Sequence, residues 1–368
     1  MRRGAAAASL TIIASVAGSA CPARAQTLTL GANAIFYGDN TEFHNPFREG
    51  ETIFGAAVRL DGRVEMNDSA TLTLGVFGNQ RFGSSDAFEM VRPIVALTVS
   101  GRRSTFVVGT LPSPFESRPL SAARASGPDL GGPHGLLPPL QVETLAFDRP
   151  YEAGLAWTFR GARFEHEMWL QWQRLNTREH RERLDAGGTA SWRAAGPFSI
   201  PFQAHIVHEG GQLFASGPVR DSIAVASGIA LSNKRALPSA TSPSLVTTLE
   251  LFGLWSRYTA DREAPDPSRD GGAFFGRASA SLRGWRAHLI AWRGDDFIKD
   301  EGDPNYLSIR RDGSRYRGVR DYAESGLTRT FQLAPGAALQ ASFRFHRIER
   351  HYEYSYRIVA VADIRVRP

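Results

Sequence analysis

Hydrophobic and polar residues alternate over long stretches of the chain. The clearest stretch is the C-terminal HYEYSYRIVAVADIRVRP, residues 351–368, where every second residue from Tyr352 to Val366 is apolar. The intervening residues are polar apart from two valines. A side-chain period of two predicts a β-strand with one apolar and one polar face. Most strands run about five or six residues, so this pattern predicts an unusually long strand.

The same alternation recurs along the whole chain and predicts about sixteen strands. Helical periodicity is nearly absent, and only residues 119–125 have a pattern that could form a short helix. The predicted strands cover residues 27–37, 51–66, 69–82, 87–100, 103–111, 151–160, 163–175, 185–195, 199–209, 220–232, 244–258, 273–283, 285–293, 319–333, 338–349 and 351–366.

The connections between these strands alternate in length. Nearly every second connection is minimal, such as Asn67-Asp68, Gly101-Arg102 and Arg283-Gly284. The others are mostly long and polar, at 38–50, 112–150, 176–184, 210–219, 259–272 and 294–318. Short periplasmic turns and longer outer loops are typical of bacterial outer-membrane barrels. An even strand count places both chain ends at the short-turn end.

The pattern therefore predicts an all-β protein, a closed up-and-down antiparallel transmembrane barrel. Strands of ten to fifteen residues suffice to cross a bilayer, and a sheet in lipid must close so that every backbone group finds a partner. A barrel of about sixteen strands is wide enough to leave an aqueous lumen. A soluble sandwich would not need tight turns throughout one end, and a β-helix would show a repeat of about 20 to 25 residues, which we do not find.

This layout resembles the general porins and related Gram-negative outer-membrane β-barrels across essentially the whole chain after residue 25. The resemblance rests on the alternation, the turn asymmetry and the long loop after the fifth strand. It implies that the loop 112–150 folds into the lumen and narrows it. The implied constriction residues are Glu116, Arg118, Arg124 and Asp129. One departure is the C-terminus, because such barrels usually end in an aromatic residue and this chain ends in Arg367-Pro368.

The first 25 residues predict a signal peptide, followed by a single β-barrel domain over 26–368. A cationic MRRG start precedes a short apolar core, and Ala23-Arg24-Ala25 presents small residues to a signal peptidase. Cys21 offers a lipoprotein alternative. Cleavage after Ala25 would remove the only cysteine and leave 40 basic and 37 acidic residues, a net charge of +3. The basic character therefore does not indicate nucleic-acid binding.

If the apolar register faces lipid, the other register lines the pore. Almost all basic residues are arginines, since Lys234 and Lys299 are the only lysines. An excess of inward arginine predicts a modest anion preference, whereas the alternative is that these charges only pair across neighbouring strands. The predicted pore-lining residues are Arg59, Arg63, Glu165, Glu167, Gln171, Arg277, Arg286, His288, Arg344, His346 and Arg357.

The sequence offers little evidence for catalysis or metal binding. In HIVHEGGQ, residues 205–212, His205 and His208 are three apart and point to opposite strand faces, which makes them poor co-ligands. Ser342 and His346 share a strand face but stand about 13 Å apart, beyond hydrogen-bond reach. We therefore expect no catalytic residues, no metal site and no cofactor.

The sequence therefore predicts an outer-membrane pore for passive diffusion of small hydrophilic solutes, not an enzyme. One alternative is an uptake or export barrel for a saccharide, for which Trp169 and Trp292 would supply inward aromatic surface. A further alternative is a lipid-modifying enzyme of the barrel wall, such as a phospholipase or a lipid A-modifying enzyme. The expected partners are outer-membrane lipid, the barrel assembly machinery and the transported solute or saccharide, but no nucleic acid; a homo-oligomer is left open.

Overall fold

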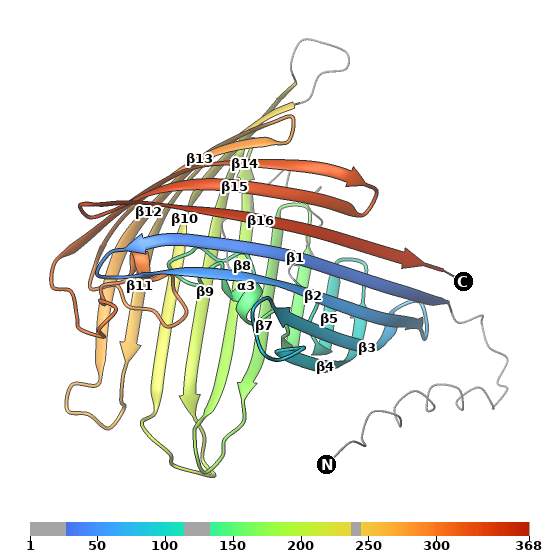
Figure 1. The fold of residues 1–368 in the computed structure, drawn as a ribbon, viewed down its shortest axis with the longest axis horizontal. Coiled ribbons are helices and arrows are strands. Elements are labelled where there is room, and N and C mark those ends of the chain that lie inside the picture. The colour runs from blue at the N-terminus through green and yellow to red at the C-terminus, as the bar shows by residue number, and fades with distance from the viewer. Residues whose placement is uncertain (1–26, 114–132, 237–243, 368) are drawn as a thin grey trace.

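The computed structural model describes residues 27–113, 133–236 and 244–367, and it is a closed antiparallel barrel of sixteen strands (Figure 1). None of the helices in these residues has the length and apolar character that a membrane crossing needs. The strands are β1 (Leu28–His44), β2 (Glu49–Glu65), β3 (Ala70–Arg81), β4 (Met90–Ser100), β5 (Ser104–Thr110), β6 (Ala153–Arg160), β7 (Phe164–Arg174), β8 (Glu182–Ala195), β9 (Phe198–Gly210), β10 (Arg220–Ala236), β11 (Ser244–Thr259), β12 (Ser268–Leu282), β13 (Trp285–Asp295), β14 (Val319–Ala334), β15 (Ala337–Ile348) and β16 (His351–Val366).

The first and last strands close the barrel. Strand β1 pairs with β2 on one side and with β16 on the other, so that Ile35 stands opposite both Ala57 and Val361. Every other strand pairs with its neighbours in the chain. The predicted fold class, with sixteen strands in an up-and-down order, is therefore confirmed.

Alternating burial shows which face of each strand is turned inward. Along β13, exposed and buried residues alternate without exception. Trp285, Ala287 and Leu289 are exposed, whereas Arg286 and His288 are buried. A transmembrane barrel turns its apolar register to lipid and its polar register to the lumen. On this strand the structure therefore confirms the lipid-facing and lumen-facing residues that the alternation predicted.

Turn chemistry explains the tight end of the barrel. Between β12 and β13, Arg283 has φ 51° and Gly284 has φ 81°. Two successive residues with positive φ are the signature of a two-residue type I′ hairpin turn, whose twist matches the flanking strands.

Some strands run further toward the long-loop end than the hydrophobic pattern indicated. Strand β1 continues to His44, through residues that the sequence placed in the loop 38–50. Asp39, Asn40 and Thr41 still pair with both neighbouring strands. Likewise β12 begins at Ser268, inside the predicted loop 259–272. In both places the ladder continues beyond the apolar band, where polar residues no longer reveal a strand.

Among the described residues, two long chain segments fold back into the barrel (Figure 1). One is the described part of the loop after β5, residues 133–150, which includes the short helix α3 (Leu145–Asp148). The other is the connection between β13 and β14, residues 296–318, which includes the 3-10 turn η2 (Pro304–Tyr306). The backbone of Val142 donates to Glu301 O at 2.6 Å, and that of Asp303 donates to Pro138 O at 2.9 Å, so the two inserted segments are joined to each other.

The inserted segments supply an apolar cluster in the middle of the lumen. Leu136, Leu137 and Leu140 are fully buried and pack with Phe297 and Tyr306 from the other segment. Inward side chains of the wall, among them Trp169, Phe252, Phe275 and Trp292, complete the cluster. Side chains thus occupy a level of the barrel where a water-filled lumen was expected. The predicted short helix at 119–125 and the signal peptide at 1–25 lie outside the described residues.

Candidate functional site

Strand register brings a serine, a histidine and a glutamate together on the inner wall. Two rows of residues cross strands β14 to β16 near the long-loop end. In the first row Glu324 stands opposite His346, which stands opposite Glu353. In the second row Arg344 stands opposite Ser355. Directly paired residues on one face have Cβ atoms about 5 Å apart, and diagonal neighbours are also within reach. We call Tyr322, Glu324, Arg344, His346 and Ser355 the serine–histidine cluster.

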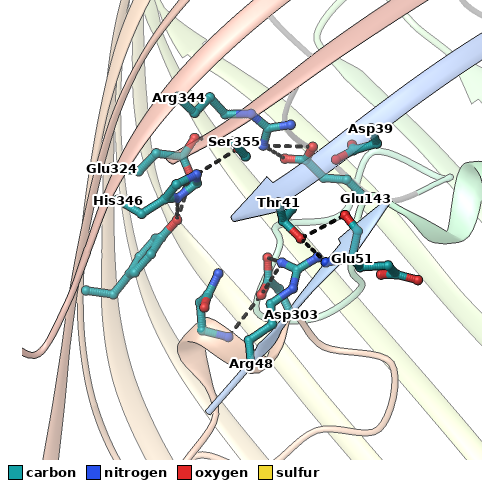
Figure 2. Close-up of polar contacts among 12 residues, drawn as sticks. Asp39, Thr41, Arg48, Glu51, Glu143, Asp303, Glu324, Arg344, His346 and Ser355 are labelled. Carbon is teal, nitrogen blue, oxygen red and sulfur yellow. Dashed lines mark hydrogen bonds and ion pairs between the residues drawn. The ribbon is translucent and has the colours of Figure 1, made fainter. Parts of the chain in front are cut away.

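The hydrogen bonds of this cluster form one chain, shown in part in Figure 2. The hydroxyl of Tyr322 donates to Glu324 Oε2 at 2.6 Å and lies 2.7 Å from His346 Nδ1. His346 Nε2 lies 2.8 Å from Ser355 Oγ. Because the Tyr322 hydroxyl gives its only hydrogen to Glu324, it accepts the hydrogen of His346 Nδ1. His346 Nε2 then carries a lone pair, and the Ser355 hydroxyl donates to it.

These hydrogen bonds, from Ser355 to His346 and from His346 to Tyr322, follow the order in which a histidine base activates a serine nucleophile. A serine hydroxyl is a weak nucleophile unless an adjacent base takes its proton and a third group orients that base. Here His346 stands in the position of the base, and Tyr322 with Glu324 fixes its tautomer. Ser355 and His346 are each only 3% exposed.

Arg344 is placed to stabilise negative charge beside Ser355. It stands opposite Ser355, and its Nη1 holds Glu143 of the first inserted segment at 3.1 Å. Its Nε is buried and has no hydrogen-bond partner among the described residues. A buried donor without a partner is costly, and such a donor beside a nucleophile is suited to the oxyanion of an acyl-transfer reaction.

Glycine makes room for this packing on β14. A Cβ at Gly326 would lie 2.2 Å from His288 Cε1 and 3.0 Å from Arg344 Cγ. The space lets His288 Nε2 reach Glu324 Oε1 at 2.9 Å. Glu324 therefore has a partner on each oxygen.

Ion pairs connect the cluster to the inserted segments. Glu143 also accepts from Arg357 Nη1 at 2.6 Å, and Arg357 pairs with Asp39 of β1. On the outer side of the cluster, Arg48 Nη1 contacts both carboxylate oxygens of Asp303 at 3.0 Å (Figure 2). Burial raises the pKa of Asp303, although Arg48 acts in the opposite direction. Charged groups thus hold both inserted segments against the wall.

A separate cavity of about 750 Å³, which we call the vestibule, lies toward the short-turn end of the barrel. Its wall includes Arg59, Arg63 and Thr73, and at its inner end His134 contacts Glu152 at 2.9 Å and Glu167 at 3.0 Å. Burial would lower the pKa of His134, but the two carboxylates raise it to about 10. An imidazolium therefore closes the inner end of this vestibule at neutral pH.

The residues predicted to line a pore lie at different places in the barrel. Arg59, Arg63 and Glu167 border the vestibule. Arg344 and His346 belong to the serine–histidine cluster, His288 contacts its Glu324, and Arg357 is linked to its Arg344 through Glu143. Arg277 pairs with Glu250 at 2.6 Å. Gln171 and Arg286 are buried, and Glu165 is exposed. That they line an open pore stays a prediction. The predicted constriction residues Glu116, Arg118, Arg124 and Asp129 lie outside the described residues.

Sequence reasoning found His346 but missed its partners. It compared His346 with Ser342, four residues away on the same strand, and correctly judged that pair too distant. The real neighbours are Ser355 on β16 and Tyr322 and Glu324 on β14. The signal that could have found them is the hairpin register around the tight Glu349-Arg350 connection, which sets Ser355 diagonally across from His346.

Comparison with solved structures confirms the predicted resemblance to outer-membrane barrels, and a closed sixteen-strand barrel of this kind belongs in the outer membrane. A loop L8 deletion mutant of OmpT, an outer membrane protein of Vibrio cholerae, matches with a TM-score of 0.52 and 10% identity over 92% of this chain and 100% of that chain. The anion-selective porin from Comamonas acidovorans matches with a TM-score of 0.50 and 11% identity over 92% and 100%. At such identities the likeness concerns the fold alone. No curated protein sequence matches the chain.

A family model provides the functional comparison. Residues 20–365 match the family described as lipid A 3'-O-deacylase-type. This is a family of enzymes, and the match covers nearly the whole chain. The expectation that the protein is not an enzyme is therefore wrong. It was drawn from the lack of a local motif, whereas a catalytic group in a barrel can be assembled across strands.

Proposed function

The chain belongs to the lipid A 3'-O-deacylase-type family, and from this premise we propose that it hydrolyses an acyl ester of a lipid A-like glycolipid in the outer membrane. The observation that carries the proposal is the 2.8 Å contact between Ser355 Oγ and His346 Nε2, with His346 oriented by Tyr322 and Glu324. The further alternative from the sequence, a lipid-modifying enzyme, thus becomes the leading hypothesis.

The proposed reaction has two steps. Ser355 Oγ attacks the ester carbonyl while His346 Nε2 takes the hydroxyl proton, and the carbonyl oxygen becomes an oxyanion beside Arg344 Nε. The sugar hydroxyl then leaves with the proton from His346, and the acyl group stays on Ser355. Water, deprotonated by His346, attacks the acyl-enzyme and releases a fatty acid and free Ser355.

The position of the cluster suits a substrate that arrives from the outer leaflet. Ser355 and His346 lie close to the ends of β16 and β15 at the long-loop end, which in such barrels faces outward. Unlike the barrel-wall enzymes considered from the sequence, the cluster faces the lumen rather than lipid. Since Ser355 is buried, the ester would reach it only when covering side chains move.

Labelling with a fluorophosphonate probe tests the nucleophile directly. We expect the folded full-length chain in detergent to be labelled on Ser355, and to release a fatty acid from purified lipid A, detected by mass spectrometry. Ser355→Ala should abolish both. Ser342→Ala, also on the luminal face but on the neighbouring strand, is the matched control and should retain both. Equal labelling of wild type and Ser355→Ala would contradict the proposal.

Passive diffusion remains a second candidate because of the vestibule at the short-turn end and its arginines. A channel would need a path past the apolar cluster formed by Leu136, Leu137 and Leu140. Single-channel recording in a planar bilayer, with salt gradients, tests this function and its anion preference. Stable anion-selective steps from the wild-type chain would support it.

A further inference from the structure

A second group of ligating side chains lies apart from the serine–histidine cluster. Asp185 of β8, His205 of β9 and Glu301 of the second inserted segment each turn one ligand atom toward the others, and these atoms all lie within 4.8 Å of one another. His205 Nε2 is 3.1 Å from Asp185 Oδ2 and 4.0 Å from Glu301 Oε2. All three side chains are at most 4% exposed.

Hydrogen bonds fix the orientation of His205. Its Nδ1 lies 2.9 Å from the backbone oxygen of Leu140, which can only accept. Nδ1 therefore carries a hydrogen. Without a metal ion, Nε2 donates a second hydrogen to Asp185 Oδ2; a bound metal ion would take the place of that hydrogen between Nε2 and the carboxylates. A histidine whose Nδ1–H is held by a backbone carbonyl is the usual arrangement of a metal ligand.

The two carboxylate oxygens of Glu301 supply an independent observation that points to a cation site. Its Oε1 accepts from Arg149 at 2.7 Å, Arg183 at 3.0 Å and Gln173 at 3.2 Å. Its Oε2 is buried and has no hydrogen-bond partner among the described residues. One oxygen is thus saturated with donors, and the other faces His205 with none. Three electron-rich atoms converge at this point.

The surrounding positive charges do not fill the space between these atoms. Arg149 and Arg183 bind the far oxygen of Glu301. Lys299 Nζ donates to Asp300 O at 2.8 Å and to Ser222 Oγ at 3.4 Å. Asp185 Oδ1 accepts from Trp169 Nε1 at 2.9 Å and Oδ2 from Gln173 Nε2 at 3.3 Å. The two arginines therefore bind the oxygen of Glu301 that faces away from His205, and Lys299 binds neither Asp185 nor Glu301 in these contacts.

We propose that Asp185, His205 and Glu301 bind one divalent transition-metal ion, with Zn²⁺ as the best match. One imidazole and two carboxylates suit Zn²⁺, whose bonds to nitrogen and oxygen are about 2.0–2.2 Å long. Ligand atoms around such an ion stand roughly 3.4 Å apart in a tetrahedron. The separations from His205 Nε2 are 3.1 Å to Asp185 and 4.0 Å to Glu301, so Glu301 would have to move inward on binding. The ion would join β8 and β9 to the second inserted segment. This site does not depend on the proposed hydrolase activity.

The two histidines of HIVHEGGQ then have different roles. His205 is the ligand, but its partners come from another strand and a distant loop rather than from His208. His208 Nδ1 instead contacts Asp221 Oδ1 at 2.8 Å. This gives a matched pair of variants on one strand.

Zn²⁺ titration of the chelator-treated, folded full-length chain tests the site. We expect one high-affinity equivalent by calorimetry and a change in tryptophan emission, because Trp169 donates to Asp185. His205→Gln should weaken binding at least about 100-fold, whereas His208→Gln should bind as wild type. Glu301→Gln, on a loop, is the second variant in case His205→Gln does not fold. Preference for Ca²⁺ or Mg²⁺, no stoichiometric binding, or wild-type affinity in both site variants would overturn the proposal.

Discussion

Replacing His346 by alanine is expected to slow acyl-ester hydrolysis by about 10⁴-fold. His346 Nε2 is the only proposed acceptor for the Ser355 proton, and a positioned base together with its nucleophile accounts for rate effects of this order. Glu324→Gln should cost roughly 10³-fold, because an amide nitrogen could donate to Tyr322 and reverse the hydrogen bonds that set the His346 tautomer. Tyr322→Phe should cost less, since Glu324 Oε2 remains 3.5 Å from His346 Nδ1. Initial rates of fatty-acid release measure all three.

The control for this series is His351→Ala, because His351 is exposed at the start of β16. It should leave the rate unchanged. Each variant is first checked for the heat-dependent gel mobility of a folded barrel. A folded His346→Ala variant with the wild-type rate would exclude the serine–histidine cluster as the catalytic group.

Replacing Arg320 by methionine is expected to release the second inserted segment and destabilise its attachment by about 3 kcal/mol. Arg320 is fully buried, and its guanidinium donates to Asn305 O at 2.8 Å and to Leu307 O at 3.1 Å. It also lies over the ring of Phe47. Methionine fills a similar volume but leaves two buried carbonyls without their donor, and each such loss costs about 1–3 kcal/mol.

Trypsin can read out this release, because the segment carries Arg310, Arg311, Arg315 and Arg317. Cleavage there should become much faster in Arg320→Met, and bilayer conductance should rise as the lumen opens. Arg329→Met is the control on the same strand: Arg329 lies over Trp285 and Phe331, far from the segment. Unchanged cleavage in Arg320→Met would show that other contacts hold the segment in place.

The barrel could be predicted from the sequence because the bilayer acts on each residue separately. A lipid-facing position is apolar whatever its neighbours are, so alternation reveals strands and faces without knowledge of pairing. Arg329 is a charged residue in the mostly apolar, outward register of β14, and the structure explains its place there. It lies near the short-turn end, stacks on Trp285 and Phe331, and donates to Arg283 O.

The candidate site could not be predicted, because it depends on neighbours across strands. Which residue of β16 stands beside His346 follows from hairpin register, and the sequence indicates that register only to within a residue or two. One residue of slip would turn Ser355 to the lipid side. Insertion of the loop 112–150 was expected only from the resemblance to porins, and insertion of residues 296–318 was not expected. Leu136, Leu137 and Leu140 pack against a curved inner wall, and no local period marks residues that fill a lumen.

Glu143 has a consequence for the order in which the molecule is assembled. It belongs to a segment that precedes β6, yet its carboxylate is held by Arg344 of β15 and Arg357 of β16. Arg357 in turn pairs with Asp39 of β1, across the junction that closes the barrel. The first inserted segment therefore cannot complete its docking until the last two strands have arrived. Closure of the barrel between β1 and β16 and docking of the first inserted segment are therefore completed together, by residues of the last two strands.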